Sequence, residues 1–533
     1  MKQRWGIVAV VAVVSFFSGG WLLRGARMPA GLHGPELLQT VLNYVSHFYV
    51  DSLPPDSLYD LAATGAVRAL NDPYSTLEQV EDFRSLNEVT SGNYGGLGMQ
   101  IDVRGGWITV IAPLPQTPAE RAGIEPGDQI EEVNGKSVQG VSQDKAIKTL
   151  RGAAGTKVEL RIRRPGIATL LPFTLVREII HNRSTQPGTM LDKTVGYVSL
   201  STVSDSSASE LRGEINGLLK HGMKGLILDL RTNPGGLLSQ GVSVSDLFLD
   251  AGRRIVETRG RMPEMNRQFV DETPQVWPTL PVVVLVDEYT ASAAEIIAGA
   301  LQDNDRAVIV GAATFGKGLV QSLWPFGDGK GLKLTTGRWF TPSGRTIQRT
   351  AKSQEEQQRL AIAEASHNDL HWLDSLPSFK TVSGRTVKGG GGIVPDRIVR
   401  ADTLTAPERD FAKTLGPNVS TFRDALVAEA LDLKAKHGVQ SPDFQVTDAM
   451  RQAVLSRMAA RQVTLTPAEV AGGSRLIDQQ LSYEVERYVF GRAAELRRRT
   501  QDDAQVRAAL ELFRNGGTQA ALMSQVAGGP AGK

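Results

Sequence analysis

Residues 195–310 alternate short apolar runs with segments of helical period, and this alternation restricts the fold more than any other feature of the chain. The apolar runs predict strands over 195–200, 225–230, 281–286 and 307–310. The segments between them predict helices over 208–220, 237–249 and 291–301. Strands that alternate with helices are typical of a mainly parallel sheet covered by helices. We therefore expect an α/β core in this part of the chain.

At 533 residues the chain is longer than one hydrophobic core usually supports, so we expect several domains. Apolar spacing predicts helices after the N-terminal segment, glycine turns between short β-like runs predict a β-rich domain, and an Ala-, Arg- and Glu-rich end predicts further helices. The predicted parts are an N-terminal segment, N-terminal helices, the β-rich domain, the α/β core and a C-terminal helical region: 1–24, 34–88, 91–177, 178–400 and 401–533. Within the core, the mainly polar residues 351–371 predict an insertion or a mobile loop.

The N-terminus carries an uncharged run of membrane-spanning length. Lys2 and Arg4 precede residues 5–23, which would form a helix of about 28 Å at about 1.5 Å per residue. That length is close to the hydrocarbon thickness of a bilayer, about 30 Å. Residues 21–24 are Trp-Leu-Leu-Arg, which lack the small side chains of a signal-peptide cleavage site. We expect an uncleaved membrane anchor with the bulk of the chain outside the cytoplasm; a buried helix of a soluble domain is the alternative.

Composition excludes several kinds of chemistry. The chain has no cysteine, which removes disulfides, thiol nucleophiles, thiolate metal sites and a lipid-bearing cysteine. The formal net charge of +2 gives no basic excess for binding nucleic acid. Neither observation fixes the compartment, because an exported protein can do without disulfides.

A serine at the start of a helix follows the buried strand predicted over 281–286. Ser292 would lie at the carboxyl edge of the sheet, where α/β folds place their sites. The N–H groups and the dipole at a helix N-terminus can stabilise a developing oxyanion. A structural interpretation also fits, because Ser292 and Glu295 form the S-x-x-E pattern of a capping box. The serine alone does not decide between catalysis and capping.

Lys317 favours the catalytic interpretation. It lies between Gly316 and Gly318 after the strand predicted over 307–310, so the backbone can approach closely. A lysine can serve as a general base when burial keeps it neutral, and a Ser–Lys pair is a known variant of the serine-nucleophile arrangement. Gln321 follows four residues later, at a spacing suited to orienting the amine.

Other interpretations of this part of the chain fit less well. Residues 311–317 match G-x-x-x-x-G-K, but Gly318 replaces the Ser or Thr that holds magnesium in a phosphate-binding loop. Residues 319–326 also predict a strand, whereas such a loop must open a helix. His367 and His371 have metal-like spacing without the glutamate of a zinc protease, and they lie in the polar insertion. We therefore expect neither a metal nor a nucleotide cofactor.

Three motifs resemble those of the carboxyl-terminal processing, or tail-specific, serine proteases. The motifs are T-A-S-A-A-E over 290–295, T-F-G-K-G-x-x-Q over 314–321 and D-L-R-x-N-P-G-G over 229–236. The resemblance covers residues 34–399. One departure is Ala294, where the family often has a second serine.

The family's catalytic residues carry over to the matching positions. The resemblance implies a nucleophile, a general base and a residue that orients the base: Ser292, Lys317 and Gln321. It also implies an oxyanion hole, in which the N–H of Ala293 is paired with that of Gly235 or Gly236. The sequence leaves open which glycine donates.

The β-rich domain resembles the family's PDZ domain. The resemblance rests on Y-G-G-L-G-M over 94–99 and on P-A-E-R-A-G-I-x-P-G-D over 118–128, followed by V-N-G. In such a domain free N–H groups of a glycine loop capture a terminal carboxylate, and the adjacent strand pairs with an extended peptide. The residues that the resemblance assigns to this loop are Gly96, Leu97, Gly98 and Met99. Arg151 matches a position that the family uses to couple peptide binding to the active site; an exposed helix-end charge is the alternative.

Together these observations predict a serine endopeptidase that recognises the free, apolar C-terminal tails of protein substrates. The membrane is the other expected partner, through the N-terminal anchor, and no nucleic acid is expected. The C-terminal helices are expected to form either an oligomer or adaptor surface or a cap on the protease. The alternative function is a non-catalytic PDZ scaffold, which the intact Ser292, Lys317 and Gln321 argue against.

Overall fold

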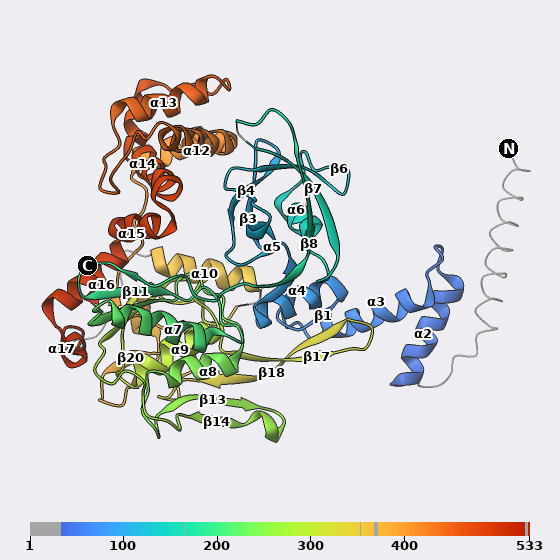
Figure 1. Ribbon diagram of the computed structural model, residues 1–533. Helices are drawn as coiled ribbons and strands as arrows, with labels where there is room; N and C mark the ends of the chain where they lie inside the picture. Colours follow the sequence, from blue (N-terminus) through green and yellow to red (C-terminus); the bar gives the residue numbers. More distant parts are fainter. Residues whose placement is uncertain (1–33, 165, 352, 367–370, 528–530, 533) are drawn as a thin grey trace, which may run out of the picture. The chain divides into compact units, whose positions relative to one another are not determined.

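The computed structural model describes residues 34–527, except 165, 352 and 367–370, together with residues 531 and 532 (Figure 1). The chain divides between residues 77 and 78 into two compact units. In the described part of the chain no helix is both long and apolar enough to cross a membrane. The anchor predicted over residues 1–24 lies outside that part.

The N-terminal unit contains two helices, in the region where the sequence predicts helices. They are α2 (Pro35–Phe48) and α3 (Pro55–Arg68). Each begins with a proline, whose fixed φ suits the first helical turn, and carries an acidic residue in that turn. Leu42 and Leu58 are buried, whereas most other apolar side chains of this unit are exposed. The short strand β1 (Thr76–Glu78) follows.

The β-rich module is an antiparallel sheet with two helices. Its strand order is β3-β4-β5-β7-β8, with β6 paired to β5. The elements are β3 (Met99–Arg104), β4 (Trp107–Pro113), α5 (Pro118–Arg121), β5 (Gln129–Val133), β6 (Lys136–Ser137), α6 (Gln143–Leu150), β7 (Lys157–Arg163) and β8 (Leu171–Val176). Alternate residues of β7 are buried, as expected of a strand with one face on a core. Ile108, Ile130 and Leu160 lie at the centre of that core.

The module is inserted into the rest of the chain. Helix α4 (Val80–Ser91) precedes it, and strand β2 (Asn93–Gly96) leads into it. Strand β9 (Glu178–His181) leads out and pairs antiparallel with β2. Entry and exit therefore lie side by side, which lets the module occupy one site along the chain without interrupting the core that follows.

The central sheet of the core is mainly parallel, which confirms the predicted fold class. Its strand order is β10-β11-β12-β15-β16-β21-β22, and only the β10–β11 pair is antiparallel among the described strands. The strands are β10 (Thr189–Met190), β11 (Val195–Ser199), β12 (Gly225–Asp229), β15 (Val282–Val286), β16 (Val308–Gly311), β21 (Arg397–Ile398) and β22 (Ala531–Gly532). All residues of β12, β15 and β16 are buried, which explains why the sequence shows them as continuous apolar runs.

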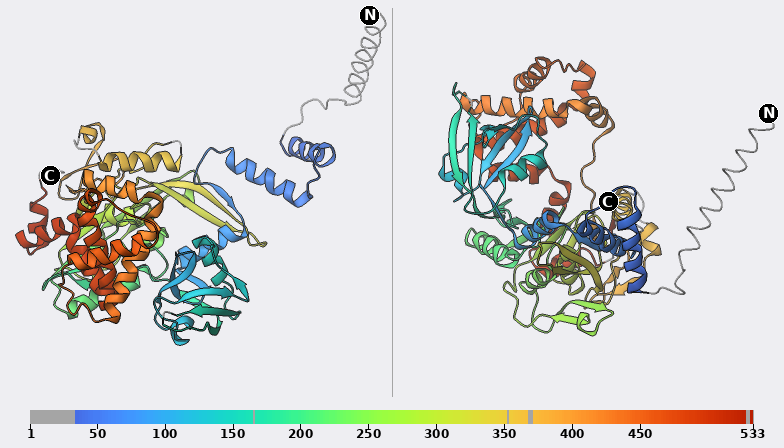
Figure 2. Two further views of the ribbon diagram at one scale, coloured as in Figure 1. Left: turned by 90° about the horizontal axis from the view of Figure 1, so that it is seen from above. Right: turned by 90° about the vertical axis from the view of Figure 1, so that its right-hand side faces the viewer.

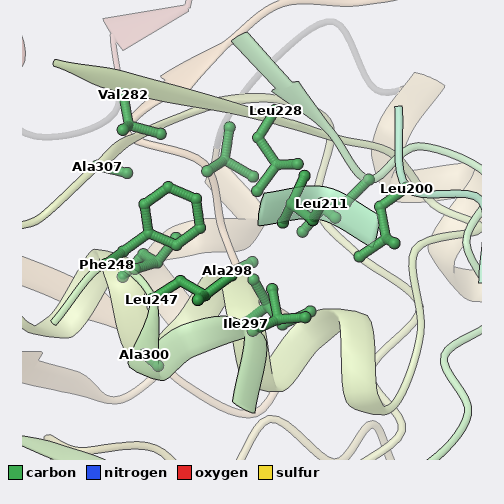
Figure 3. Packing of buried hydrophobic residues seen from close by; sticks show 14 of the residues in the cluster. Leu200, Leu211, Leu228, Leu247, Phe248, Val282, Ile297, Ala298, Ala300 and Ala307 are labelled. Atoms are coloured by element: carbon green, nitrogen blue, oxygen red, sulfur yellow. The ribbon is translucent and has the colours of Figure 1, made fainter. Parts of the chain in front are cut away.

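Helices cover both faces of this sheet (Figure 1). One face packs against α7 (Ser207–Lys220), α8 (Leu238–Asp246) and α9 (Ala293–Asp303). Figure 3 shows this layer, in which Phe248 and Ile297 face Leu228 and Val282 of the sheet. The other face packs against α16 (Ala504–Asn515) and α17 (Gln519–Ser524). The core is therefore a three-layer α/β/α structure.

A second, antiparallel sheet adjoins the core, and the sequence predicted little of it. Strand β18 pairs with β17 and with β13, and β13 pairs with β14. The strands are β13 (Arg254–Gly260), β14 (Arg267–Val270), β17 (Leu319–Pro325) and β18 (Gly331–Phe340). Of these four strands, the sequence predicts only β17. Most residues of β18 are half-buried, so its sequence shows neither a continuous apolar run nor a clean alternation.

Residues 354–366, within the stretch expected to be an insertion or a mobile loop, form a helix. Helix α10 (Gln354–Ser366) occupies most of this stretch, followed by η2 (His371–Ser375) and the hairpin β19 (Ser378–Lys380) and β20 (Thr386–Lys388). Glu355 and Glu356 in its first turn suit the helix dipole. Gln357 is buried and donates from Nε2 to the carbonyl of Gly316 at 2.5 Å. The polar side chains therefore belong to a docked helix.

The predicted C-terminal region, 401–533, consists of two parts that pack separately. The first part is a helical bundle with its own apolar core, seen in orange to red in Figure 2. It contains α11 (Ala406–Leu415), η3 (Gly416–Asn418), α12 (Val419–Ala435), α13 (Asp448–Ala459), α14 (Pro467–Val485), the π-turn η4 (Glu486–Phe490) and α15 (Arg492–Asp502). The second part, α16 and α17, belongs to the α/β core, because Val506, Ala509 and Leu512 recur at helical spacing and cover the open sheet face.

Candidate active site

Three loops that follow neighbouring strands meet at one edge of the central sheet. They are the loops after β12, β15 and β16: 230–237, 287–292 and 312–318. Because these strands are parallel neighbours, their carboxyl ends lie at the same edge, where open α/β sheets place their ligands. The catalytic residues predicted from the sequence all lie in these loops or in the element that follows one of them.

Ser292 lies in a strained turn between β15 and α9. Its φ of 54° and ψ of −118° lie outside the usual regions for a non-glycine residue, which costs about 1–3 kcal/mol. The N–H of Ala291 donates to the carbonyl of Asn233 (2.9 Å), and Thr290 Oγ1 donates to the carbonyl of Leu230 (2.9 Å). Helix α9 is buried along its whole length, so the turn cannot relax without moving the core. The serine is therefore presented, half-buried, at a fixed helix N-terminus.

Glu295 joins the serine turn to the lysine loop. Its buried Oε2 accepts both the N–H of Ser292 (2.7 Å) and the N–H of Lys317 (2.9 Å). Its Oε1 accepts the N–H of Gly316 (2.8 Å) and the hydroxyl of Thr314 (2.5 Å). Burial raises the pKa of Glu295, while the hydrogen bonds from Thr314, Lys317 and Gly316 oppose that rise. The capping interaction is thus present, and the same carboxylate also fixes the lysine loop.

The amine of Lys317 meets Gln321. Lys317 is half-buried just before β17, and its Nζ donates to Gln321 Oε1 at 3.0 Å. The indole N–H of the buried Trp339 donates to the carbonyl of Lys317 at 3.1 Å. The β17–β18 register is irregular between Val320 and Gln321, and such a bulge re-aims the neighbouring side chains. The two side chains that the sequence paired by spacing therefore lie in contact.

The glycine loop after β12 approaches the serine turn closely. At Gly235 (φ 89°) a Cβ atom would lie 2.8 Å from the nitrogen of Ala293 and 2.8 Å from Cβ of Ser292, so no larger residue fits. The N–H of Gly235 donates to Asn233 Oδ1 at 2.8 Å. In the described part of the chain, the N–H groups of Gly236 and Ala293 donate to no other group. Of the two glycines left open by the sequence, Gly236 is therefore the one with an uncommitted N–H.

Polar residues to which the sequence assigned no role support this loop. Asn233 also donates from Nδ2 to the carbonyl of Leu200 at 2.7 Å. The guanidinium of Arg231 pairs with Asp229 (2.6 Å) and with Asp503 (2.6 Å), the N-cap residue of α16. The D-L-R-x-N part of the motif over 229–233 is the sequence signal from which these supporting residues could have been predicted. The oxyanion-hole prediction rested on the glycines of this motif, whereas its polar residues are those that hold the loop in place.

The phosphate-binding alternative raised by the sequence does not fit this geometry. β17 begins at Leu319, where a phosphate-binding loop would require a helix. Among the residues that the structure describes, no group of three His, Cys, Asp or Glu side chains could hold a metal ion. His367 lies outside these residues, so the spacing of His367 and His371 remains untested.

A second candidate site is a groove in the β-rich module. It lies between β3 and α6 and has a volume of about 500 Å³. The loop residues assigned from the sequence all line it: Gly96, Leu97, Gly98 and Met99. Over the described residues, the N–H groups of Leu97 and Gly98 donate to no other group. Thr117 Oγ1 donates to the carbonyl of Gly98 at 2.8 Å, which fixes the loop with those N–H groups uncommitted.

Arg151 lies at the end of α6, beside this groove. Its guanidinium stacks over the ring of Tyr94, 4.3 Å from the ring centroid, and Nη1 donates to Glu88 Oε2 of α4 at 2.7 Å. Burial raises the pKa of Tyr94, and the charge of Arg151 opposes that rise. Among the contacts of the described residues, none joins Arg151 to Ser292 or Lys317. Its coupling role stays a prediction.

Comparison with protein-family models gives two matches. The model of peptidase family S41 matches residues 194–354, a range that contains Ser292, Lys317 and Gln321. The model of the PDZ domain matches residues 109–164, so the glycine loop over 96–99 lies just outside the matched range.

Curated relatives extend these matches to most of the chain. The chain is 34% identical to the carboxy-terminal processing protease CtpA of Bacillus subtilis over 381 residues, which are 70% of this chain and 80% of that protein. It is 37% identical to the carboxy-terminal-processing protease of Bartonella bacilliformis over 302 residues, 56% of this chain and 69% of that protein. Among solved structures, the photosystem II D1 C-terminal processing protease is 28% identical, with 61% of this chain and 90% of that chain covered and a TM-score of 0.35.

Proposed function

This chain belongs to peptidase family S41, the carboxy-terminal processing serine proteases, and we propose that it cleaves protein substrates with a Ser292–Lys317 dyad after binding their C-terminal tails. One observation carries the dyad. The buried carboxylate of Glu295 accepts the N–H of both residues on a single oxygen, so the serine turn and the lysine loop are held as one unit.

The first half of the reaction forms an acyl-enzyme. The neutral amine of Lys317 takes the proton of the Ser292 hydroxyl, and the oxygen attacks the carbonyl carbon of the scissile peptide bond. The resulting oxyanion is stabilised by the N–H groups of Ala293 and Gly236, aided by the dipole of α9. As the tetrahedral intermediate collapses, the C–N bond breaks and the Lys317 ammonium returns its proton to the leaving amine.

The second half releases the product and restores the dyad. Lys317, neutral again, takes a proton from water, and the hydroxide attacks the acyl carbonyl carbon. The ester bond to Ser292 breaks, and the serine oxygen recovers a proton from the ammonium. Gln321 accepts a hydrogen bond from the amine at 3.0 Å, which orients the amine and leaves its lone pair for the proton transfer.

Tail recognition is assigned to the groove between β3 and α6. The uncommitted N–H groups of Leu97 and Gly98 suit a terminal carboxylate, and the edge of β3 suits pairing with an extended peptide. Apolar side chains line the floor of the groove, including Ile101, Ile147 and Leu150, which supports a preference for apolar terminal residues.

Proteolysis of an unfolded protein with an apolar C-terminus tests this function. Cleavage should be lost with Ser292→Ala and with Lys317→Ala, and slowed when the substrate carboxylate is amidated. It should also fall at acid pH, because protonation of Lys317 removes the base. Cleavage that survives Ser292→Ala contradicts the assignment, whereas tail binding without cleavage by the unmutated chain favours the PDZ scaffold alternative.

We also propose that the chain is anchored in the membrane by residues 5–23, with its catalytic part outside the cytoplasm. The support is the length and uniformity of that run behind Lys2 and Arg4. Protease added to spheroplasts should digest the catalytic part, and deletion of residues 1–24 should release it from the membrane fraction. Full protection from added protease contradicts the proposal.

A further inference from the structure

One wall of the tail-binding groove comes from the C-terminal helical bundle. Besides residues of β3 and α6, the groove is lined by Arg423 of α12 and Arg487 of η4. A further contact joins the bundle to the same strand, because Arg492 Nη1 donates to Gln100 Oε1 at 2.6 Å. A peptide bound in the groove would therefore meet side chains that lie more than 240 residues after the module in the sequence.

The contacts from the bundle fall on one face of β3. Met99, Ile101 and Val103 pack against the module's own core. Because successive side chains of a strand point to opposite faces, Gln100 and Asp102 project from the other face. These two residues are the ones that Arg492 and Arg423 contact.

Arg423 adds positive charge at Asp102. Its Nη2 lies 2.5 Å from Asp102 Oδ2, and Arg104 Nε lies 3.2 Å from the same oxygen. Two guanidinium groups thus share one carboxylate, and among the described lining residues Asp102 is the one acid. The Arg423 side chain keeps 56% of its surface exposed, so a ligand can reach it from solvent.

Two other arginines that line the groove, Arg487 and Arg151, are each neutralised by an acid of their own. Arg487 pairs with Glu495 at 2.6 Å, and Arg151 pairs with Glu88 at 2.7 Å. Arg423 shares its one acid, Asp102, with Arg104, so its positive charge is only partly neutralised. Of these two arginines, Arg423 has the exposed side chain. A substrate carboxylate that reaches Arg423 would therefore be stabilised by the remaining positive charge and by the exposed guanidinium.

The geometry of strand addition indicates which substrate residue reaches Arg423. A tail whose carboxylate is held by Leu97 and Gly98 pairs antiparallel with β3, and its last residue, position 0, lies beside Met99. Each earlier residue lies one position further along β3, so position −3 lies beside Asp102. Side chains at 0 and −2 point between β3 and α6, and those at −1 and −3 point to the face where Arg423 lies.

We propose that Arg423 gives this protease a preference for substrate tails with Asp or Glu at position −3. The C-terminal bundle then acts as part of the recognition site, and the ligand is an extended peptide with an apolar last residue and an acidic residue three positions before it. This rests on the proposed function, because it assumes that the groove binds C-terminal tails.

Peptide binding to the full chain carrying Ser292→Ala tests the proposal. Two fluorescein-labelled ten-residue peptides, identical except for Glu or Gln at position −3 and both ending in leucine, are titrated by fluorescence anisotropy. The Glu peptide should bind about threefold more tightly at low salt, as expected for one exposed ion pair, and the preference should shrink at high salt. Arg423→Gln should abolish it.

Arg461→Gln is the matched control. Arg461 lies in the same bundle, is 53% exposed, and pairs with an aspartate, Asp424, at 2.7 Å, but it does not line the groove. This variant should keep the preference for Glu.

The outcomes separate the failure of this proposal from the failure of the proposed function. Equal affinities for the two peptides, when a C-terminal amide still weakens both, overturn the role of Arg423 and leave tail binding intact. A preference for Glu that survives Arg423→Gln overturns the role of Arg423 in the same way. If neither peptide binds, or if amidation has no effect, the tail-binding function fails and this proposal fails with it.

Discussion

At the scale of single residues, Glu295 joins the serine turn to the lysine loop that carries the proposed base. The S-x-x-E pattern suggested two interpretations, a helix cap or a nucleophile, and the capping interaction seen in the structure is compatible with the proposed nucleophile. In the cap, the carboxylate of Glu295 accepts a hydrogen bond from the N–H of Ser292. The same carboxylate also accepts hydrogen bonds from the N–H groups of Lys317 and Gly316 and from the hydroxyl of Thr314. A capping residue on an ordinary surface helix would have only the first of these partners.

Glu295→Gln should lower kcat and leave KM little changed. Glutamine has one acceptor oxygen where the carboxylate has two, so the buried donors that bind one of the two carboxylate oxygens lose their acceptor. An unsatisfied buried donor destabilises the fold by about 1–3 kcal/mol. We expect kcat to fall by about tenfold or more, together with a lower unfolding temperature. Steady-state kinetics measure this effect, with Glu288→Gln, in the loop that precedes α9, as the control. An unchanged kcat contradicts the positioning role.

Asp271 provides a second test at this scale, through pH. Burial, followed by the neighbouring carboxyl of Asp246, raises the pKa of Asp271 to about 7. Its pKa in the unfolded chain is about 3.9, so the folded state binds the additional proton between about pH 4 and 7. Its contribution to stability is therefore full below that window and is lost as the pH rises through it.

Asp271→Asn should stabilise the protein at pH 8 and have little effect near pH 4.5. The amide keeps a donor toward Asp246 and cannot ionise. Unfolding temperatures of the two proteins, measured across this range, should diverge as the pH rises. A difference that is the same at both ends of the range contradicts the assigned pKa.

At the scale of elements, the site depends on how closely three loops approach one another. Gly235 is the point of closest approach, because its missing side chain leaves room for the serine turn. Its N–H is held by Asn233, which orients the following peptide so that the N–H of Gly236 stays uncommitted. The proposed oxyanion hole therefore depends on the position of the glycine loop and on the side chains that hold this loop in place.

Gly235→Ala should reduce kcat by about 100-fold, the effect of losing an oxyanion donor. The added Cβ would lie 2.6 Å from the carbonyl oxygen of Ala291, so the loop or the turn must move. Gly252→Ala is the control, because Gly252 has a similar φ of 86° with nothing within 4 Å of an added Cβ. Similar losses in both variants would mean that backbone strain, and not the close approach, is responsible.

The sequence predicted the elements that are buried on both sides and missed those that are half-buried. β15 and α9 were found because nearly every residue in them is apolar or small. β18 was missed because its side chains are mostly intermediate in burial. The stretch that contains α10 was predicted as an insertion or a mobile loop, because its polarity masks a helix that docks through Gln357. Likewise the candidate catalytic residues could be named from motifs, whereas Asn233 and Glu295 act through backbone contacts that only the folded chain brings together.

At the scale of the whole molecule, the C-terminal residues complete the core. Helix α16 covers the sheet face formed by residues such as Ile227 and Val283, and its N-cap residue Asp503 pairs with Arg231 below the glycine loop. No local pattern in the sequence shows that α16 belongs to a core whose strand β21 ends more than 100 residues earlier. The predicted region 401–533 therefore contains both a bundle with its own core and two helices, α16 and α17, that pack on the α/β core.

Ending the chain at residue 502 should prevent stable folding of the core. The truncation exposes a fully apolar sheet face and leaves Arg231 without Asp503. We expect an aggregated or protease-sensitive product, whereas a chain that ends at residue 527 keeps α16 and α17 and should fold. Limited proteolysis and size-exclusion chromatography compare the two. A soluble, active protein ending at 502 contradicts the assignment of α16 to the core.

The central claim is that Ser292 is the nucleophile and Lys317 its base, and covalent labelling tests it most directly. A fluorophosphonate probe reacts with the full chain, and peptide mapping by mass spectrometry locates the adduct. We predict a single adduct on Ser292, with a labelling rate that falls at least about 100-fold with Lys317→Ala. An adduct on another residue, or a rate that does not depend on Lys317, would contradict the claim.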